Sequence, residues 1–307
     1  MKTSRLRNPR VVRAIEDEVW CVTPNKLREI VHVASRLIDD PAAAMPHAME
    51  DSDVLYLDRA AAGPPYQMAG STAIIPVMGT ISKRMGMLSE FSGGMSIERF
   101  TQAFRAALSD SSVTNIVLQI DSPGGSIYGV QEVAQEIYDA RGQKNLFAIA
   151  DDLAASAAYW IGSAVSELWV TPSGEVGSIG VVMMHVDYSK AMEAGGVKVT
   201  YVHAGDNKVE GNPYQALGEE ALSFMQQRVG EYYDKFISAV SRGRNTTSAN
   251  VNKNFGQGRV FGAEQAKSLG MVDRIGTIDD LMARMPSRKR RSANAEADIA
   301  IATALAS

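Results

Sequence analysis

Four short motifs in this chain combine glycine, serine and lysine in a pattern that suits acyl-transfer chemistry. The first is residues 121–126 (DSPGGS), where two adjacent glycines let the backbone turn sharply and direct N–H groups toward a developing oxyanion. The second is residues 154–160 (AASAAYW), where small neighbours leave the Ser156 hydroxyl open at the start of an expected helix. Taken singly, the first is also typical of a tight turn and the second of a helix cap.

The third and fourth motifs supply polar side chains in glycine-containing loops. Residues 174–181 (GEVGSIGV) contain Ser178, whose hydroxyl could orient a catalytic group or satisfy the backbone of a turn. Residues 204–213 (AGDNKVEGNP) contain Lys208. A lysine in a loop is normally solvated, so neither motif indicates a function on its own.

The composition narrows the classes of chemistry that are open to the chain. Cys21 is the only cysteine, which excludes an internal disulfide framework and a cysteine-rich zinc site. The four histidines, at positions 32, 47, 185 and 203, are not paired at metal-ligand spacing. The net charge of −4 gives no chain-wide field for nucleic acid. We therefore expect no metal, no cofactor and no nucleic-acid partner, and a general base other than histidine.

The elements that must position these motifs alternate between strand and helix from residue 72 onward. Such alternation predicts an α/β fold with parallel strands and covering helices. We expect strands over 73–79, 113–120, 146–150, 168–171, 179–184 and 197–202, and helices over 96–108, 126–141, 154–163, 188–194, 218–241, 263–269 and 278–285.

The chain divides into three parts. Residues 1–70 form an N-terminal extension, with an amphipathic helix over 25–37 that docks on the main domain or, as the less favoured alternative, on a partner. A linker over 39–63 leads to the main domain, residues 71–287. Residues 288–307 are a basic and Ala-rich tail that we expect to be disordered, with nucleic-acid contact by its basic cluster the less favoured interpretation.

The sequence predicts neither a signal peptide nor a transmembrane segment. Residues 1–20 alternate charged and apolar residues, and the longest apolar-rich stretch, 146–170, is interrupted by three acidic residues. We therefore expect a cytosolic protein.

In this order, the four motifs resemble the signal peptide peptidase A family of serine peptidases. Residues 177–185 (GSIGVVMMH) and 207–217 (NKVEGNPYQAL) are most similar to the phage head-maturation proteases of the lambda minor capsid protein C type. The resemblance covers roughly residues 71–285. It implies a Clp protease/crotonase-like α/β fold with repeated ββα units and a C-terminal helical segment. It also implies a homo-oligomer, in which the serine and lysine of one site can come from neighbouring subunits.

The resemblance assigns a role to each matching residue. Ser156 becomes the nucleophile, Lys208 the general base and Ser178 the serine that positions that lysine. Gly124 and Gly125 match the oxyanion loop. The N–H of Ala157 is a second oxyanion donor.

The chemistry of a lysine base adds a physical condition. A lysine of ordinary pKa, about 10.4, is protonated at pH 7 and cannot accept the proton of a serine. We therefore expect Lys208 to be desolvated in the working enzyme, with Asp206 and Glu210 directed away from it. His185, 29 positions after Ser156, is a rival base, but it ends an apolar run where a structural histidine is commoner.

The favoured function is cleavage of scaffold and coat proteins, and of the chain itself, during phage head maturation. The expected partners are these protein substrates together with portal or capsid contacts, and no membrane is expected. The expected location is the host cytoplasm and the phage procapsid. Two alternatives are a soluble bacterial peptidase of the same family that degrades signal peptides or oligopeptides, and a non-catalytic capsid assembly protein. A crotonase-type acyl-CoA enzyme is disfavoured by the placement of Ser156 and Lys208.

Overall fold

The structure is a computed structural model that describes residues 18–39, 65–83 and 94–285. Most of the expected linker and the whole expected tail lie outside the described residues. The division of the chain into an extension, a peptidase domain and a tail stays a prediction.

A mostly parallel sheet forms the centre of the molecule. β3 (Thr72–Met78), β6 (Asn115–Ser122) and β8 (Asn145–Ala155) run parallel in that order. β9 (Glu167–Val170) pairs in parallel with the first half of β8, and β10 (Glu175–Gly177) pairs in parallel with its end. The expected α/β class is confirmed. Shorter strands complete this sheet: β2 (Gln67–Ala69), β11 (Val260–Gly262) and β12 (Arg274–Ile275).

A second, smaller sheet joins distant parts of the sequence. Its strand order is β1 (Trp20–Val22), β7 (Gly124–Ser126), β4 (Ile81–Ser82) and β5 (Met95–Ser96). β1 is antiparallel to β7, so the N-terminal extension contributes a strand to the folded core.

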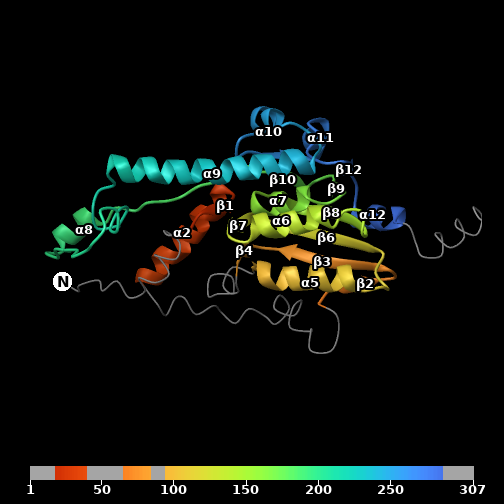
Figure 1. Ribbon diagram of the computed structural model, residues 1–307, viewed down its shortest axis with the longest axis horizontal. Helices are drawn as coiled ribbons and strands as arrows, with labels where there is room; N and C mark the ends of the chain where they lie inside the picture. Colours follow the sequence, from red (N-terminus) through yellow and green to blue (C-terminus); the bar gives the residue numbers. More distant parts are fainter. Residues whose placement is uncertain (1–17, 40–64, 84–93, 286–307) are drawn as a thin grey trace, which may run out of the picture.

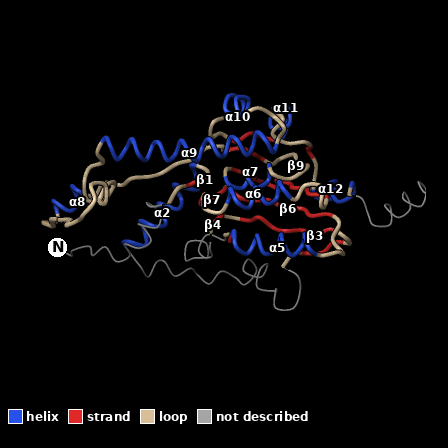
Figure 2. Tube along the Cα trace, viewed as in Figure 1, coloured by secondary structure: helices blue, strands red, loops and turns tan. Residues whose placement is uncertain are grey.

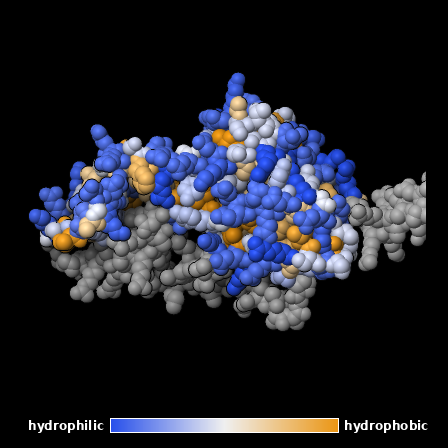
Figure 3. All heavy atoms as spheres, viewed as in Figure 1, coloured by the Kyte–Doolittle hydropathy of each residue, from blue (hydrophilic) through white to orange (hydrophobic). Residues whose placement is uncertain are grey.

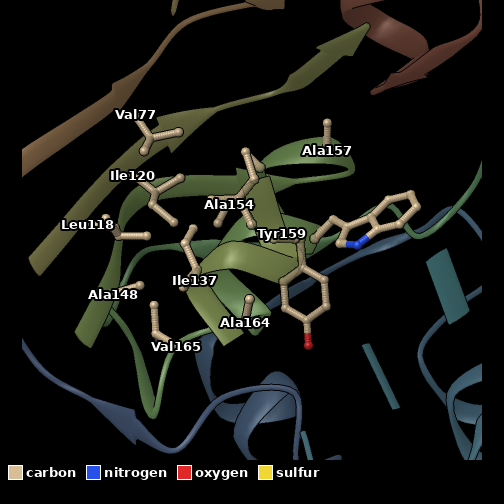
Figure 4. Close-up of a cluster of buried hydrophobic side chains, with 14 of the residues drawn as sticks. Val77, Leu118, Ile120, Ile137, Ala148, Ala154, Ala157, Tyr159, Ala164 and Val165 are labelled. Atoms are coloured by element: carbon tan, nitrogen blue, oxygen red, sulfur yellow. The ribbon is translucent and has the colours of Figure 1, made fainter. Parts of the chain in front are cut away.

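The two faces of the large sheet are covered by different helices. In β6, Ile116, Leu118 and Ile120 point into the main core, and Val117 points to the opposite face, where it clusters with Leu281 of α12 (Ile278–Arg284). Figure 4 shows part of the main core, in which β6 side chains meet residues of the covering helices. These helices are α5 (Ile97–Ser109), α6 (Val130–Asp139), α7 (Ala157–Ser163) and part of α9 (Glu219–Gly243) (Figure 1).

Local sequence explains where these helices begin. α5 buries Phe100, Ala103, Phe104 and Ala107 at helical spacing, and its N-cap residue Ser96 accepts a hydrogen bond from the Arg99 N–H at 3.4 Å. α12 begins with a capping box between its N-cap threonine and an aspartate. The remaining helices are α2 (Pro24–Asp39), α8 (Ser189–Ala194), α10 (Ser248–Asn254) and α11 (Ala263–Ser268).

Two expected helices start later than the sequence pattern indicated. The helix expected over 126–141 starts at Val130, because the glycine pair before it forms strand β7. The helix expected over 154–163 starts at Ala157, because β8 continues to Ala155. Both differences fall at the candidate catalytic turns.

Residues 185–217, which include α8, form an arm that extends from the core together with the first half of α9 (Figures 1 and 2). Two strand predictions, one before the arm and one within it, are wrong. In the run 179–184 only Val182 forms a bridge, to Trp20, and residues 197–202 pair with no described strand. An apolar run needs a neighbouring strand to become part of a sheet, and Val202, at 98% exposed, has no such neighbour.

The arm carries apolar side chains on its surface (Figure 3). Val197 and Val199 before α9, and Leu222 and Phe224 at its start, are exposed. Among the described helices, none is both long and apolar enough to cross a membrane.

Candidate active site

Ser156 occupies a strained turn between the end of β8 and the start of α7. Its φ of 55° and ψ of −119° lie in a region that residues other than glycine rarely adopt, at a cost of order 1–3 kcal/mol. The turn is held on both sides: the Ser156 N–H donates to the Gly177 carbonyl at 2.7 Å, and its carbonyl accepts from the Trp160 N–H at 2.9 Å. Strain of this kind clusters at functional sites.

The Ser156 hydroxyl is buried, and no described nitrogen or oxygen atom is its hydrogen-bond partner. An orphaned buried hydroxyl is costly in a folded protein, and a catalytic role is one of the recognised reasons for keeping it. The Cys21 thiol lies close to it: burial raises the pKa of this thiol, and the neighbouring Ser156 hydroxyl acts in the opposite direction.

The glycine pair of the first motif lies directly against Ser156. Gly124 has a φ of 93°, and a Cβ placed there would collide with the Cys21 carbonyl oxygen and lie 2.9 Å from the Ser156 Cβ. Only glycine fits this position, on grounds of both conformation and space. The fold therefore brings the first two motifs together.

Ser122 shapes the turn before the glycine pair. Its hydroxyl donates to the Gly79 carbonyl at 2.6 Å and accepts from the Gly124 N–H at 3.2 Å. Sequence reasoning did not single out Ser122. The signal available was its position next to Pro123, where serine commonly bonds to nearby backbone.

Gly125 follows Gly124 in β7, and Ala157 follows Ser156 at the start of α7. A Cβ on Gly125 would lie 2.6 Å from the Ile81 nitrogen, so β7 passes too close to β4 for any side chain here. Ala157 is buried at the first position of α7, where a helix N–H has no acceptor within the helix. The roles of both residues in binding an oxyanion stay predictions.

Ser178 is joined to Ser156 through Gly177. Its φ is 54°, its side chain is buried, and its N–H donates to the Arg259 carbonyl at 2.7 Å. Three of the four motifs thus meet around Ser156.

Lys208 lies outside this cluster in the single chain. It is exposed in a turn of the arm, where its N–H donates to the Gly205 carbonyl at 3.1 Å. It forms no ion pair with a described residue, Asp206 and Glu210 included. Because Lys208 is exposed, the desolvation expected of a lysine base is absent in a single chain. The rival base His185 is partly buried, and its Nε2 lies 3.3 Å from the Asn212 carbonyl oxygen.

Comparisons with known proteins find similar peptidases. Residues 139–291 match the sequence profile of Peptidase family S49. The chain is 34% identical over 221 residues to the "Head-tail preconnector protein GP5" of Enterobacteria phage P21, which covers 72% of this chain and 44% of that protein. It is 31% identical over 220 residues to the "Capsid assembly protease C" of Escherichia phage lambda, covering 72% of this chain and 50% of that protein.

A bacterial protein is also similar. The chain is 29% identical over 194 residues to a "Putative signal peptide peptidase SppA" of Enterococcus faecium, which covers 63% of this chain and 56% of that protein. The chain spans half or less of the length of the two phage relatives.

Proposed function

Because this chain carries a domain of peptidase family S49, we propose that it is a serine endopeptidase that cleaves capsid proteins during phage head maturation. The observation that carries the proposal is the buried, strained Ser156, whose hydroxyl has no nitrogen or oxygen partner among the described residues and which lies against Gly124. A serine nucleophile beside a glycine-rich turn is the arrangement that acyl transfer requires.

The proposed mechanism uses Lys208 as the base. Its neutral amine takes the proton of the Ser156 hydroxyl as the oxygen attacks the scissile carbonyl. The oxyanion is held by the backbone at Gly125 and Ala157. Lys208 then protonates the leaving amine, and water hydrolyses the acyl-enzyme in the second half of the reaction. Ser178 orients the lysine.

This mechanism requires a second copy of the chain. Lys208 is exposed on the arm, and no described nitrogen atom of the same chain is hydrogen-bonded to the Ser156 hydroxyl. The arm also exposes apolar side chains, which a subunit contact would cover. We propose that the arm of one subunit places Lys208 beside the Ser156 of its neighbour, where loss of water would deprotonate the amine.

The proposed substrates are the scaffold and coat proteins of the same phage. The test is mass spectrometry of these proteins after incubation with the wild type and with Ser156→Ala. We expect defined fragments from the wild type and none from the variant. The matched control is Ser163→Ala, a buried serine of α7 whose hydroxyl donates to the Trp160 carbonyl at 2.8 Å and which should leave cleavage intact. Identical fragments from wild type and Ser156→Ala would contradict the proposal.

The similarity to the putative signal peptide peptidase supports a second candidate, a bacterial peptidase that degrades signal peptides. The neighbouring genes separate the two: portal and terminase genes favour the phage role. Normal head assembly by Ser156→Ala would instead favour a non-catalytic assembly protein.

A further inference from the structure

A segment of the N-terminal extension lies beside Ser156. Strand β1 pairs antiparallel with β7, the strand that contains the candidate oxyanion glycines. The pairing continues past both ends of β1: the Thr23 N–H donates to the Pro123 carbonyl at 3.0 Å, and the Ile127 N–H donates to the Val19 carbonyl at 3.1 Å.

The opposite edge of the same segment is also paired. Trp20 and Val182 exchange two backbone hydrogen bonds, each of 2.9 Å. Val182 belongs to the run that leaves the Ser178 loop for the arm. Residues 19–23 are therefore an extended segment that is paired on both edges, with β7 on one side and Val182 on the other. Proteins commonly bind extended peptides by such strand pairing.

The register places the Cys21 carbonyl at the catalytic turn. Cys21 lies opposite Gly125. In an antiparallel ladder every second pair is hydrogen-bonded, and the pairs Val19–Ile127 and Thr23–Pro123 are bonded. The pair Cys21–Gly125, which lies between them, is therefore also a bonded pair. The Cys21 carbonyl oxygen also occupies the space that a Cβ on Gly124 would need, next to Ser156. In a bonded pair the Cys21 carbonyl accepts from the Gly125 N–H, so β1 occupies this candidate oxyanion donor while it is in place.

The segment is packed on both of its faces. Val19 and Cys21 are fully buried in the main core, whereas Trp20 and Val22 cluster with Ile30 of α2. The Glu18 carboxylate accepts a hydrogen bond from the Ser126 hydroxyl at the end of β7. While β1 is in place, a second peptide strand cannot pair with β7.

We propose that residues 19–23 are an intramolecular inhibitory strand that fills the peptide-binding groove, so that a protein substrate enters only after β1 has left. The proposal rests on the proposed peptidase function. Because the strand is tethered to the site, its high effective concentration keeps a free substrate out. The pairing of β1 also indicates the form of the substrate, which is an extended segment antiparallel to β7 with a small side chain at the position of Cys21.

A reversible disulfide lock that holds β1 in place tests whether β1 blocks substrate binding. The Cα atoms of a bonded antiparallel pair are about 5.5 Å apart, a separation that a disulfide spans. Trp20→Cys with Val182→Cys, in a Cys21→Ser background, should therefore form a disulfide that holds β1 in the groove. We expect the oxidised protein to cleave casein at least tenfold more slowly than the same protein after reduction.

The control for the lock is Val182→Cys in the same Cys21→Ser background, which cannot form the bond within one chain. Its casein cleavage should not change on reduction. Mass spectrometry of the oxidised double variant confirms that the disulfide has formed. Equal rates for the oxidised and reduced lock would overturn the proposal.

A second measurement needs no catalysis. Cys21 is the only cysteine of the chain and is fully buried, so alkylation by a maleimide reports whether β1 has left the groove. We expect alkylation of the native protein at least 100-fold slower than in urea. Trp20→Pro, which removes the N–H that donates to Val182, should speed it at least tenfold, whereas Glu29→Gln, on the exposed face of α2, should not change it.

The two measurements separate the two proposals. Native alkylation as fast as that of the unfolded chain would show an empty groove and overturn this inference, whether or not the protein is a peptidase. The other outcome is that Cys21 is protected from alkylation but no variant, including the reduced disulfide variant, cleaves casein. This outcome would contradict the peptidase function and with it the inhibitory role of β1. It would still show that β1 lies beside Ser156.

Discussion

Ser156 donates its backbone N–H to the Gly177 carbonyl at 2.7 Å, and this bond joins the nucleophile turn to the loop that carries Ser178. Both serines have left-handed backbone conformations, with φ of 55° and 54°. Each is fixed by a backbone hydrogen bond to another segment of the same chain, Ser156 to Gly177 and Ser178 to Arg259, so the backbone that carries both serines is held in place before any substrate arrives. Rigid placement of the reacting groups is a main source of catalytic rate.

Gly124→Ala should abolish activity and weaken the fold. The new methyl would collide with the Cys21 carbonyl oxygen and crowd the Ser156 Cβ, in a backbone conformation with a φ of 93°. We expect a loss of about 2–4 kcal/mol in the free energy of unfolding, from strain and overpacking together, measured by urea denaturation. Casein cleavage should fall below detection.

The control for this variant is Gly142→Ala. Gly142 has a similar φ of 86°, but a Cβ there would have no atom within 4 Å. The free energy of unfolding of Gly142→Ala should fall by only about 1 kcal/mol, from backbone strain, and casein cleavage should be unchanged. Equal activity of the two variants would show that close packing at Gly124 is irrelevant to catalysis.

Mixing two inactive variants tests whether the site spans subunits. Ser156→Ala and Lys208→Ala should each be inactive alone. If Lys208 acts on the Ser156 of a neighbour, random mixed oligomers should regain roughly a quarter of the wild-type sites. The measurement is casein cleavage after the variants are unfolded together and refolded, and Lys253→Ala, on the exposed side of α10, is the control that stays active by itself. No recovery on mixing would contradict a shared site.

The sequence was most informative where chemistry restricts the residue type. Gly124 and Ser156 stood out because a sharp turn and a nucleophile each tolerate few residues, and the structure places them in contact. The strand expected over 197–202 was wrong because apolar periodicity says nothing about whether a partner strand is present. The pairing of Cys21 with Gly125 could not be foreseen, because β1 has three residues and its partner is far along the chain.

Arg141 should be one of the most important residues for stability outside the site. Its guanidinium donates to the Ala164 carbonyl at 2.8 Å and to the Gly243 carbonyl at 3.0 Å, so it satisfies the ends of both α7 and α9. Arg141→Met would leave these acceptors unpaired and should cost about 2–4 kcal/mol in the free energy of unfolding. The control is Arg105→Met: Arg105 pairs with Glu136 at 2.7 Å but is 65% exposed, and its loss should cost less than about 1 kcal/mol. Equal urea midpoints for the two variants would contradict this assignment.

The ion pair of Arg244 with Asp273 should make stability depend on acid pH. The Asp273 carboxylate receives two hydrogen bonds from Arg244, at 2.8 and 2.7 Å, and a third from the Leu168 N–H. Burial acts to raise the pKa of Asp273, but these bonds and the Arg244 charge outweigh it and hold the pKa below its usual value.

A lowered pKa in the folded state means that this carboxylate stabilises the fold above the pKa of the unfolded chain, near 3.9, and that the stabilisation is lost as the pH falls toward the folded value. The free energy of unfolding of the wild type should therefore decrease from about pH 5 downward. Asp273→Asn should be less stable at pH 7 and should lose less on acidification, because it has no proton to gain. Urea denaturation at a series of pH values measures both curves, and parallel curves would show that another group governs the acid response.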